Sequence, residues 1–197
     1  RSMQHQFYTL HEVAEIVSGQ LIGAAENKSI SDLLIDSRHL VDARQALFFA
    51  LTSVRNDGHK YIKELYDKGL RAFVVKLLPE EDLPEAAFIV VPDTLKALQA
   101  LAAHHRQQFD IPIIGITGSN GKTIVKEWLY QILSPDHNIV RSPKSYNSQV
   151  GVPLSVWQMN ATYDMGIFEA GISEPDEMMA LQDIIRPTIG VFTNIEI

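Results

Sequence analysis

One stretch decides the fold class: Ile111-Pro112-Ile113-Ile114-Gly115-Ile116 runs directly into Thr117-Gly118-Ser119-Asn120-Gly121-Lys122-Thr123. The first part is a nearly continuous apolar run, as expected for a strand buried on both faces of a parallel sheet. Helical patterning resumes at Ile124 and continues to Leu133. A strand, a glycine-containing turn and a helix in this order predict a phosphate-binding loop, because backbone N–H groups and the positive end of the helix then point at one anion.

The residues of this loop suit a nucleotide. Lys122 is expected to neutralise the β and γ phosphates, and the Thr123 hydroxyl to coordinate Mg²⁺. The generic nucleotide motif has a glycine where this chain has Ile116, so an ordinary glycine turn with a solvated Lys122 stays open. The predicted nucleotide-binding loop residues are Thr117, Gly118, Ser119, Asn120, Gly121, Lys122 and Thr123.

Strands and helices alternate along the chain, which predicts an α/β fold with a parallel sheet. The expected helices are Leu10 to Val17 with Thr9 as N-cap and Gly19 as stop, Tyr61 to Lys68, 93 to 108, Val152 to Trp157 and Glu177 to Ile185. The expected strands are Leu33 to Ile35, Ala46 to Leu51, Phe73 to Val75, Phe88 to Val91, Ile139 to Arg141, Met165 to Glu169 and Ile189 to Thr193. We expect a small N-terminal α/β domain over residues 3–108 and an incomplete domain with the phosphate loop over 109–197.

Glu169 is the candidate metal ligand. It closes a predicted strand of the same sheet as the loop, and a carboxylate at that end of a strand can reach a metal held by Thr123. The alternative is a surface acid at the end of a strand. His104 and His105 are adjacent on a predicted helix and therefore point to different faces, so we expect solvated side chains rather than a shared metal site.

The amino-acid composition limits the kinds of molecule that we expect the protein to bind. The net charge of −7 gives no basic surface for a nucleic acid, and no apolar run approaches the roughly 20 residues needed to span a membrane. Zero cysteines agree with a reducing compartment. We therefore expect a cytoplasmic protein that acts on small molecules without nucleic acid or membrane insertion.

The loop resembles the Thr-Gly-x-Asn-Gly-Lys-Thr segment of the Mur ligases and the folylpolyglutamate synthetases. Further segments resemble the same family in the same order: Asn147 to Pro153, Glu169 to Gly171, Pro175 to Glu177, and Thr193 to Ile195. On this resemblance Asn194 is a nucleotide-binding residue and Asn147 a substrate-binding one. Ser148 and Asp176 depart from the family's usual asparagine and glycine.

The N-terminal part is similar to the substrate domain of the Mur ligases that add the third amino acid and the terminal dipeptide. The similar segments are Asp36 to Arg38, Leu47 to Leu51 and Arg55 to His59. The resemblance implies that Ser37, Arg38, Asp57, Gly58 and His59 bind the UDP end of a UDP-N-acetylmuramoyl peptide. Asp-Ser and Asp-Gly pairs also make ordinary turns, which is the alternative for these residues.

The implied activity is ATP-dependent amide formation in peptidoglycan precursor synthesis, with Lys122 and Glu169 catalytic, Thr123 and Glu169 on Mg²⁺, and ATP as cofactor. The preferred reaction joins D-alanyl-D-alanine to UDP-N-acetylmuramoyl-tripeptide. We expect the protein to be a monomer. The alternatives are the preceding ligase, folylpolyglutamate synthetase and a noncatalytic nucleotide-binding module. Because the amine-binding domain of the family is missing, we expect residues 1–197 to be inactive alone.

Overall fold

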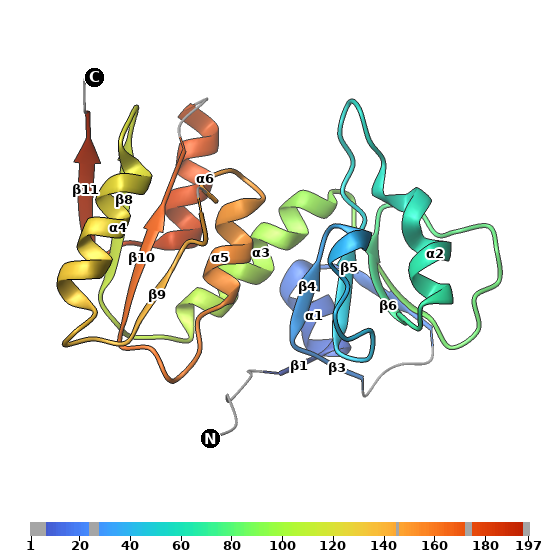
Figure 1. The fold of residues 1–197 in the computed structure, drawn as a ribbon. Helices are drawn as coiled ribbons and strands as arrows, with labels where there is room; N and C mark the ends of the chain where they lie inside the picture. The colour runs from blue at the N-terminus through green and yellow to red at the C-terminus, as the bar shows by residue number, and fades with distance from the viewer. Residues whose placement is uncertain (1–6, 24–27, 145, 172–174, 195–197) are drawn as a thin grey trace. The chain divides into compact units, whose positions relative to one another are not determined.

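The computed structural model describes residues 7–23, 28–144, 146–171 and 175–194. The chain forms two compact units, His5–Leu101 and Ala102–Ile197, and helix α3 continues from the first into the second (Figure 1). Both units are mixed α/β, which confirms the predicted fold class. Among the described residues no helix is long and apolar enough to cross a membrane.

The N-terminal unit contains short strands and helices. In chain order they are β1 (Tyr8–Thr9), α1 (Leu10–Val17), β2 (Gln20–Ile22), β3 (Ser29–Ile30), β4 (Asp32–Leu34), the 3-10 helix η1 (Ser37–His39), β5 (Ala46–Phe49), the 3-10 helix η2 (Gly58–Tyr61), α2 (Ile62–Asp67), β6 (Ala72–Val75), β7 (Ala87–Val90) and the start of α3 (Thr94–Gln107). Helix α1 begins as predicted, since Thr9 and Glu12 form a capping box. It ends at Ser18 in the left-handed conformation, one residue before the predicted stop at Gly19.

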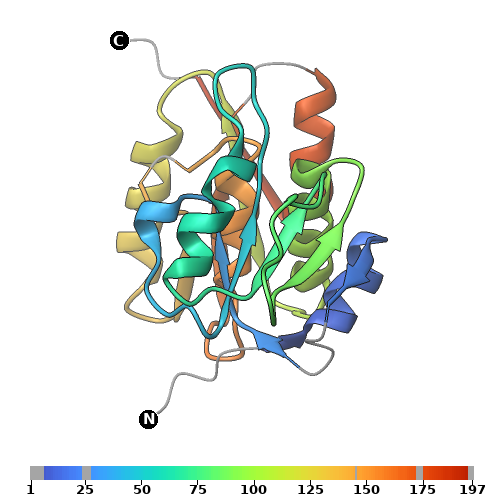
Figure 2. The same ribbon diagram turned by 90° about the vertical axis from the view of Figure 1, so that its right-hand side faces the viewer.

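A five-stranded sheet in the order β2-β7-β6-β5-β4 forms the centre of this unit. All neighbouring strands are parallel except β2, which is antiparallel to β7. Phe48, Phe73 and Phe88 share one face and pack with Ile62 and Leu65 of α2, the helix that covers this face (Figure 2). Because the strands are parallel, the residues that follow β4, β5 and β6 meet at one edge of the sheet.

The C-terminal unit contains the predicted phosphate loop. Its elements are the end of α3, β8 (Ile113–Gly118), α4 (Lys122–Leu133), β9 (Ile139–Arg141), α5 (Gly151–Trp157), β10 (Met165–Glu169), α6 (Pro175–Ile185) and β11 (Ile189–Thr193). The four strands are all parallel, in the order β11-β8-β10-β9. Strand β8 begins two residues later than predicted, after Pro112, which has no N–H to give to a ladder.

Helices cover both faces of this sheet (Figure 1). Val125 and Leu129 of α4 pack on one face against Ile116 and Ile167. The other face carries α3, α5 and α6, whose buried residues include Ala102, Val152, Val156, Leu181 and Ile184. This three-layer arrangement leaves the carboxyl ends of the strands free of helices, where doubly wound sheets bind their ligands.

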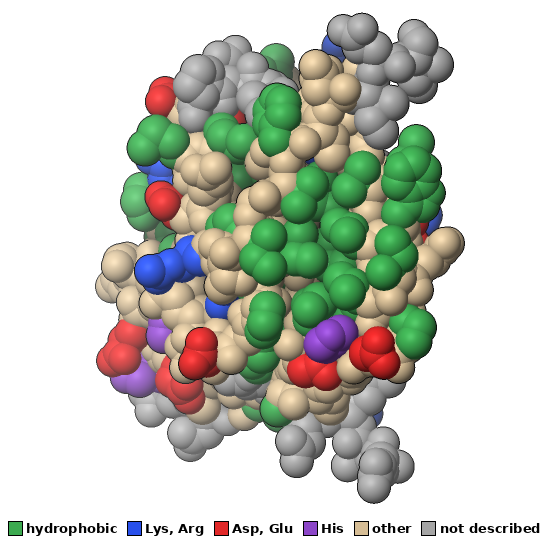
Figure 3. Space-filling view, turned by 90° about the vertical axis from the view of Figure 1, so that its left-hand side faces the viewer, with side chains coloured by type: hydrophobic (Ala, Val, Ile, Leu, Met, Phe, Trp, Pro, Cys, Tyr) green, Lys and Arg blue, Asp and Glu red, His purple; other side chains and the backbone are tan. Residues whose placement is uncertain are grey.

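An apolar surface runs over α4 and the outer strand β11. Figure 3 shows hydrophobic side chains gathered on the face that carries these two elements. Phe192 is 73% exposed there, and the other large exposed side chains are Ile124, Trp128, Ile132 and Ile189. In α4 these residues lie four apart, on the face of the helix opposite to the one that packs on the sheet.

The prediction of a solvated His105 is wrong. Only 1% of this residue is exposed; its ring packs against Phe109 and Trp157, and Nε2 lies 2.7 Å from the carbonyl oxygen of Met159. Burial lowers the pKa of His105 because it penalises the charged ring. Helical spacing alone gave no sign that α5 would cover this side of α3.

Arg106 is buried next to His105 and binds three carbonyl groups. Its guanidinium donates to the oxygens of Ile185 at 2.7 Å, Arg186 at 2.8 Å and Phe109 at 3.0 Å. The first two belong to the end of α6, where Arg186 has a left-handed φ of 44°. Arg106 therefore satisfies the last carbonyls of α6 and attaches that helix to α3.

Replacing Arg106 by methionine should lower the free energy of unfolding by about 3 kcal/mol, because it leaves buried carbonyls without donors. Arg44→Met is the matched control, since its side chain is 89% exposed, and it should change stability by less than about 0.5 kcal/mol. Urea denaturation followed by circular dichroism measures both. Equal effects of the two substitutions would contradict this role for Arg106.

Candidate functional site

Two glycines shape the loop between β8 and α4. Gly118 has a φ of +132°, and a Cβ at this position would lie 1.9 Å from the carbonyl oxygen of Thr193. Gly121 has a φ of +81° and immediately precedes the first residue of α4. Both conformations favour glycine, and the second turns the backbone into the helix. The loop therefore lies at the N-terminus of α4, where backbone N–H groups attract an anion.

The end of β11 holds this loop from the side. Thr193 Oγ1 lies 2.8 Å from the carbonyl oxygen of Asn120 and 3.2 Å from that of Thr117. Ser119 Oγ donates to Asn194 Oδ1 at 3.2 Å. The structure thus brings Asn194 against the loop, as expected for a residue of the same site. Ile195, which completes the family-like segment, lies outside the described residues.

Lys122 and Thr123 open helix α4. Lys122 Nζ donates to the carbonyl oxygen of Gly118 at 2.8 Å, so the ammonium lies over the loop rather than in bulk solvent. An ammonium has three N–H groups, and this bond uses one of them. The Thr123 hydroxyl donates to Glu169 Oε1 at 2.9 Å. The loop cation, the hydroxyl and the strand-end carboxylate are therefore neighbours.

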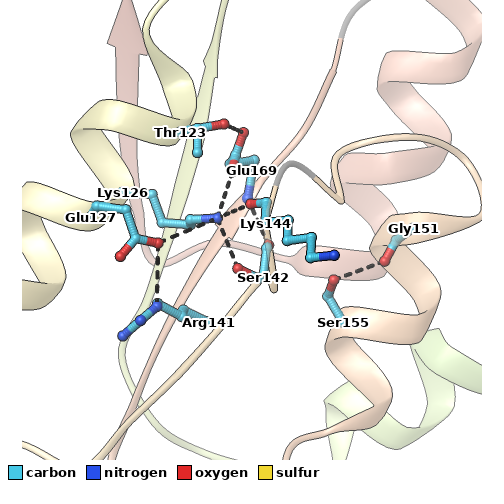
Figure 4. Close-up of polar contacts among 9 residues, drawn as sticks. All are labelled: Thr123, Lys126, Glu127, Arg141, Ser142, Lys144, Gly151, Ser155 and Glu169. Carbon is cyan, nitrogen blue, oxygen red and sulfur yellow. Dashed lines mark hydrogen bonds and ion pairs between the residues drawn. The ribbon is translucent and has the colours of Figure 1, made fainter.

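Glu169 lies at the end of β10 and is completely buried, so the alternative of a surface acid is wrong. Its Oε2 lies 2.8 Å from Lys126 Nζ, close enough for an ion pair (Figure 4). The pair does not meet hydrogen-bond geometry, and Oε2 has no hydrogen-bond donor among the described residues. A small rotation of either group would complete the bond. One carboxylate oxygen thus faces Thr123 and the other faces Lys126.

This donor set fits Mg²⁺ bound together with a nucleotide. The described residues contain no group of three or more His, Asp or Glu side chains that could hold a metal alone. Mg²⁺ in nucleotide sites usually takes one or two protein oxygens and fills its other positions with phosphate oxygens and water. A threonine hydroxyl at the loop and a buried carboxylate whose Oε1 faces that hydroxyl match that pattern.

Asn147 also belongs to this site by position. The N–H of Gly171 donates to the carbonyl oxygen of Asn147 at 2.6 Å, and a Cβ on Gly171 would lie 3.0 Å from Asn147 Oδ1. Gly171 follows Glu169 by two residues, so the structure places Asn147 beside the end of β10. The amide is therefore in the unit that carries the loop between β8 and α4, beside the residues that follow β10.

The remaining predicted residues lie in the N-terminal unit, at the carboxyl edge of its parallel strands. Ser37 and Arg38 follow β4, and Asp57, Gly58 and His59 follow β5. Arg38 is available to a ligand, since its side chain is 82% exposed although it pairs with Asp36 at 2.6 Å. Hydrogen bonds from Arg38 hold the pKa of Asp36 well below its usual range.

The other residues of this group are engaged within the protein. Ser37 is buried, and the N–H of Gly58 donates to the carbonyl oxygen of Leu51 at 2.8 Å. His59 Nδ1 lies 2.6 Å from Asp57 Oδ1, while Nε2 accepts from the N–H of Lys76 at 3.0 Å. His59 thereby connects the edges of β5 and β6. These contacts give it a structural role in the turn.

Sequence reasoning missed Lys126 and Ser142. Lys126 contacts Glu169 and donates to the carbonyl oxygen of Ser142 at 2.8 Å, while Ser142 Oγ accepts from the N–H of Glu169 at 3.2 Å. One signal was available: Lys126 lies three residues after Thr123, which places both on one face of a helix. A lysine on a helix is usually solvated, and that expectation concealed it.

Residues 116–197 match the family model described as the Mur ligase middle domain. The chain is 39% identical over 172 residues to the UDP-N-acetylmuramoyl-tripeptide–D-alanyl-D-alanine ligase of Synechocystis sp., an alignment that covers 87% of this chain and 37% of the relative. It is 31% identical over 188 residues to the ligase of the same name from Bacillus subtilis, covering 95% of this chain and 41% of the relative. The chain spans about two fifths of the length of these curated relatives.

Solved structures give the same similarity. MurF from Acinetobacter baumannii superposes with a TM-score of 0.89 at 26% identity, over 98% of this chain and 42% of that one. The MurF ligase from Thermotoga maritima, in complex with ADP, superposes with a TM-score of 0.69 at 26% identity, over 79% of this chain and 35% of that one.

The close approach of Gly118 to Thr193 leads to a prediction about the loop. Gly118→Ala should destabilise the C-terminal unit by roughly 3 kcal/mol, because the new methyl group meets a backbone carbonyl in a strained conformation. Gly190→Ala is the control, since a Cβ there has no atom within 4 Å. Urea denaturation followed by circular dichroism measures the stability of both variants. A loop that tolerates alanine at Gly118 as well as at Gly190 would refute the packing argument.

Proposed function

Since this chain belongs to the Mur ligase family, we propose that it is part of an ATP-dependent ligase that joins D-alanyl-D-alanine to UDP-N-acetylmuramoyl-tripeptide. The observation that carries the proposal is the contact between Thr123 and the buried Glu169, beside Lys122 in a glycine-shaped loop. An ordinary surface turn has no need of a buried carboxylate at that place. A site that binds nucleotide phosphates with Mg²⁺ needs a carboxylate there as a metal ligand.

The proposed reaction has two steps. An oxygen of the tripeptide carboxylate attacks the γ phosphorus of ATP, the bond to the β-phosphate oxygen breaks, and an acyl phosphate and ADP result. The amine of D-alanyl-D-alanine then attacks the acyl carbon, phosphate leaves, and the amine loses a proton. Neither step requires covalent chemistry from the protein, so positioning and charge stabilisation supply the rate.

Within this reaction the residues have distinct tasks. The backbone N–H groups of the loop from Thr117 to Thr123 hold the phosphates, and Lys122 neutralises the charge that spreads over the transferring group. Thr123 and Glu169 would hold Mg²⁺, which supplies further charge stabilisation when bound. Asn194 supports the loop through Ser119. Asn147, beside the end of β10, is positioned to orient the reacting end of a substrate.

The N-terminal unit would hold the UDP end of the muramoyl peptide. Arg38 is the candidate for the diphosphate, because a guanidinium binds phosphate oxygens in pairs and this one is exposed. Ser37 and the turn from Asp57 to His59 lie on the same edge of the sheet and would shape the site around it. The His59 bonds to Asp57 and Lys76 keep that turn in place.

The D-alanyl-D-alanine ligase is preferred over the preceding ligase because the relatives that align at 31–39% identity carry that name. Folylpolyglutamate synthetase would share the loop, but the relatives that align at 31–39% identity do not carry that name. We further propose that the enzyme acts in the cytoplasm as a monomer, and that residues 1–197 bind nucleotide without completing the reaction.

The test is phosphate release by the full-length protein with ATP, Mg²⁺, UDP-N-acetylmuramoyl-tripeptide and D-alanyl-D-alanine. Lys122→Ala should lower kcat at least about 100-fold, because it removes a cation that faces the transferred phosphoryl group. Lys96→Ala, a change at an exposed lysine of α3, should leave kcat within twofold. Release that needs the muramoyl dipeptide and a diamino acid instead would assign the preceding step, and release without any muramoyl substrate would remove the ligase assignment.

A further inference from the structure

Lys126 is a lysine in a place where a charge is costly. It lies in the second turn of α4, none of its surface is exposed, and its neighbours on α4, Val125 and Leu129, pack into the core. Isolated ammonium groups are not buried in proteins, because the loss of hydration is too large. The cation must therefore be compensated by groups that the fold brings to it.

Oxygen atoms from two other segments provide that compensation (Figure 4). Lys126 Nζ lies 2.8 Å from Glu169 Oε2 on β10 and donates to the carbonyl oxygen of Ser142 at 2.8 Å. It also donates to the carbonyl oxygen of Lys144. The ammonium has three N–H groups and meets three oxygens. Lys126 thus joins α4, the end of β10 and the segment after β9.

The neighbouring acid on α4, Glu127, is less buried than Glu169. Its carboxylate lies 3.7 Å from Lys126 Nζ and 3.4 Å from Arg141 Nε, and its side chain is partly exposed. An exposed pair of this kind contributes little. The buried partner of Lys126 is therefore Glu169, whose other oxygen accepts from Thr123.

The segment after β9 is fixed by the same group of residues. Ser142 Oγ accepts from the N–H of Glu169, and Asn147 O accepts from the N–H of Gly171. Lys126 holds the two carbonyls of Ser142 and Lys144 that lie between these attachments. A shift of the ammonium would release the carboxylate and this segment together.

A buried ion pair is a poor device for stability, since an apolar pair of similar volume is often as stable or more stable. The pair is better explained by the orientation that Lys126 imposes on the Glu169 carboxylate. We propose that Lys126 is a positioning residue for the metal-binding carboxylate: it holds Glu169 so that Oε1 faces Thr123, and it holds the carbonyl groups of Ser142 and Lys144 next to the same carboxylate. The inference rests on the proposed function, because it needs Mg²⁺ and nucleotide at this site.

The test measures metal-dependent ADP binding by the full-length protein. Lys126→Met keeps the length of the side chain and removes its charge. Calorimetric titration with ADP at a series of Mg²⁺ concentrations should give a half-maximal Mg²⁺ concentration that is about 10- to 100-fold higher than in the wild type, the range found when partners of metal ligands are removed. ADP affinity without Mg²⁺ should stay within twofold. Glu127→Gln, the control on the same helix, should change neither quantity by more than twofold.

A second comparison covers the case in which Lys126→Met does not fold because it leaves Glu169 as an unpaired buried charge. The double variant Lys126→Met/Glu169→Gln carries no such charge and is compared with Glu169→Gln alone. Equal Mg²⁺ dependence of the two proteins supports the proposal, because residues that act through one another are not additive.

Three results would overturn it: an unchanged Mg²⁺ dependence in Lys126→Met, an equal loss of ADP affinity with and without Mg²⁺, or a further loss in the double variant. Absence of ADP binding in the wild type is a different result. It would remove the proposed function, and the role of Lys126 with it.

Discussion

The buried pair of Lys126 and Glu169 constrains much of the C-terminal unit. Two charges without exposed surface are tolerated only if their other polar atoms also find partners. The fold meets this demand by bringing the Ser142 carbonyl to the ammonium and the Thr123 hydroxyl to the carboxylate. The start of α4, the end of β10 and the segment after β9 must therefore meet at one point. That point is the carboxyl edge of the sheet, where the loop between β8 and α4 also lies.

The N-terminal unit uses the same edge of its sheet with a different chemistry. Each of the 3-10 helices that follow β4 and β5 begins with an aspartate whose side chain accepts a backbone N–H two residues later. In the second, His59 extends the contact by accepting the N–H of Lys76 after β6. These turns are held by aspartates whose side chains keep some contact with solvent, rather than by a fully buried pair. They can therefore present a side chain such as Arg38 to a ligand without a large cost of burial.

Much of the fold could be predicted from the sequence, because buried parallel strands are apolar throughout and their helices carry periodic patterns. The strands Ile139–Arg141, Met165–Glu169 and Ile189–Thr193 and the helix Leu10–Val17 have the predicted bounds. The short strands β1, β2 and β3 were missed, since two or three residues cannot show a period of two. The strand, glycine loop and helix from β8 to α4 were predictable for a related reason: the glycines, lysine and threonine of the loop are close together in the sequence.

Buried charged residues were the part that the sequence did not reveal. His105, Arg106 and Lys126 all lie on helices, where a polar or charged side chain is expected in water. Each is buried because carbonyls or a carboxylate from distant segments meet it, Arg106 through Ile185 and Lys126 through Ser142 and Glu169. No local pattern contains those partners. Lys126 lies one turn after Thr123, and Glu169 ends the neighbouring strand. Because both side chains reach the same edge of the sheet, a lysine and an acid at these two positions should be considered together as a buried pair.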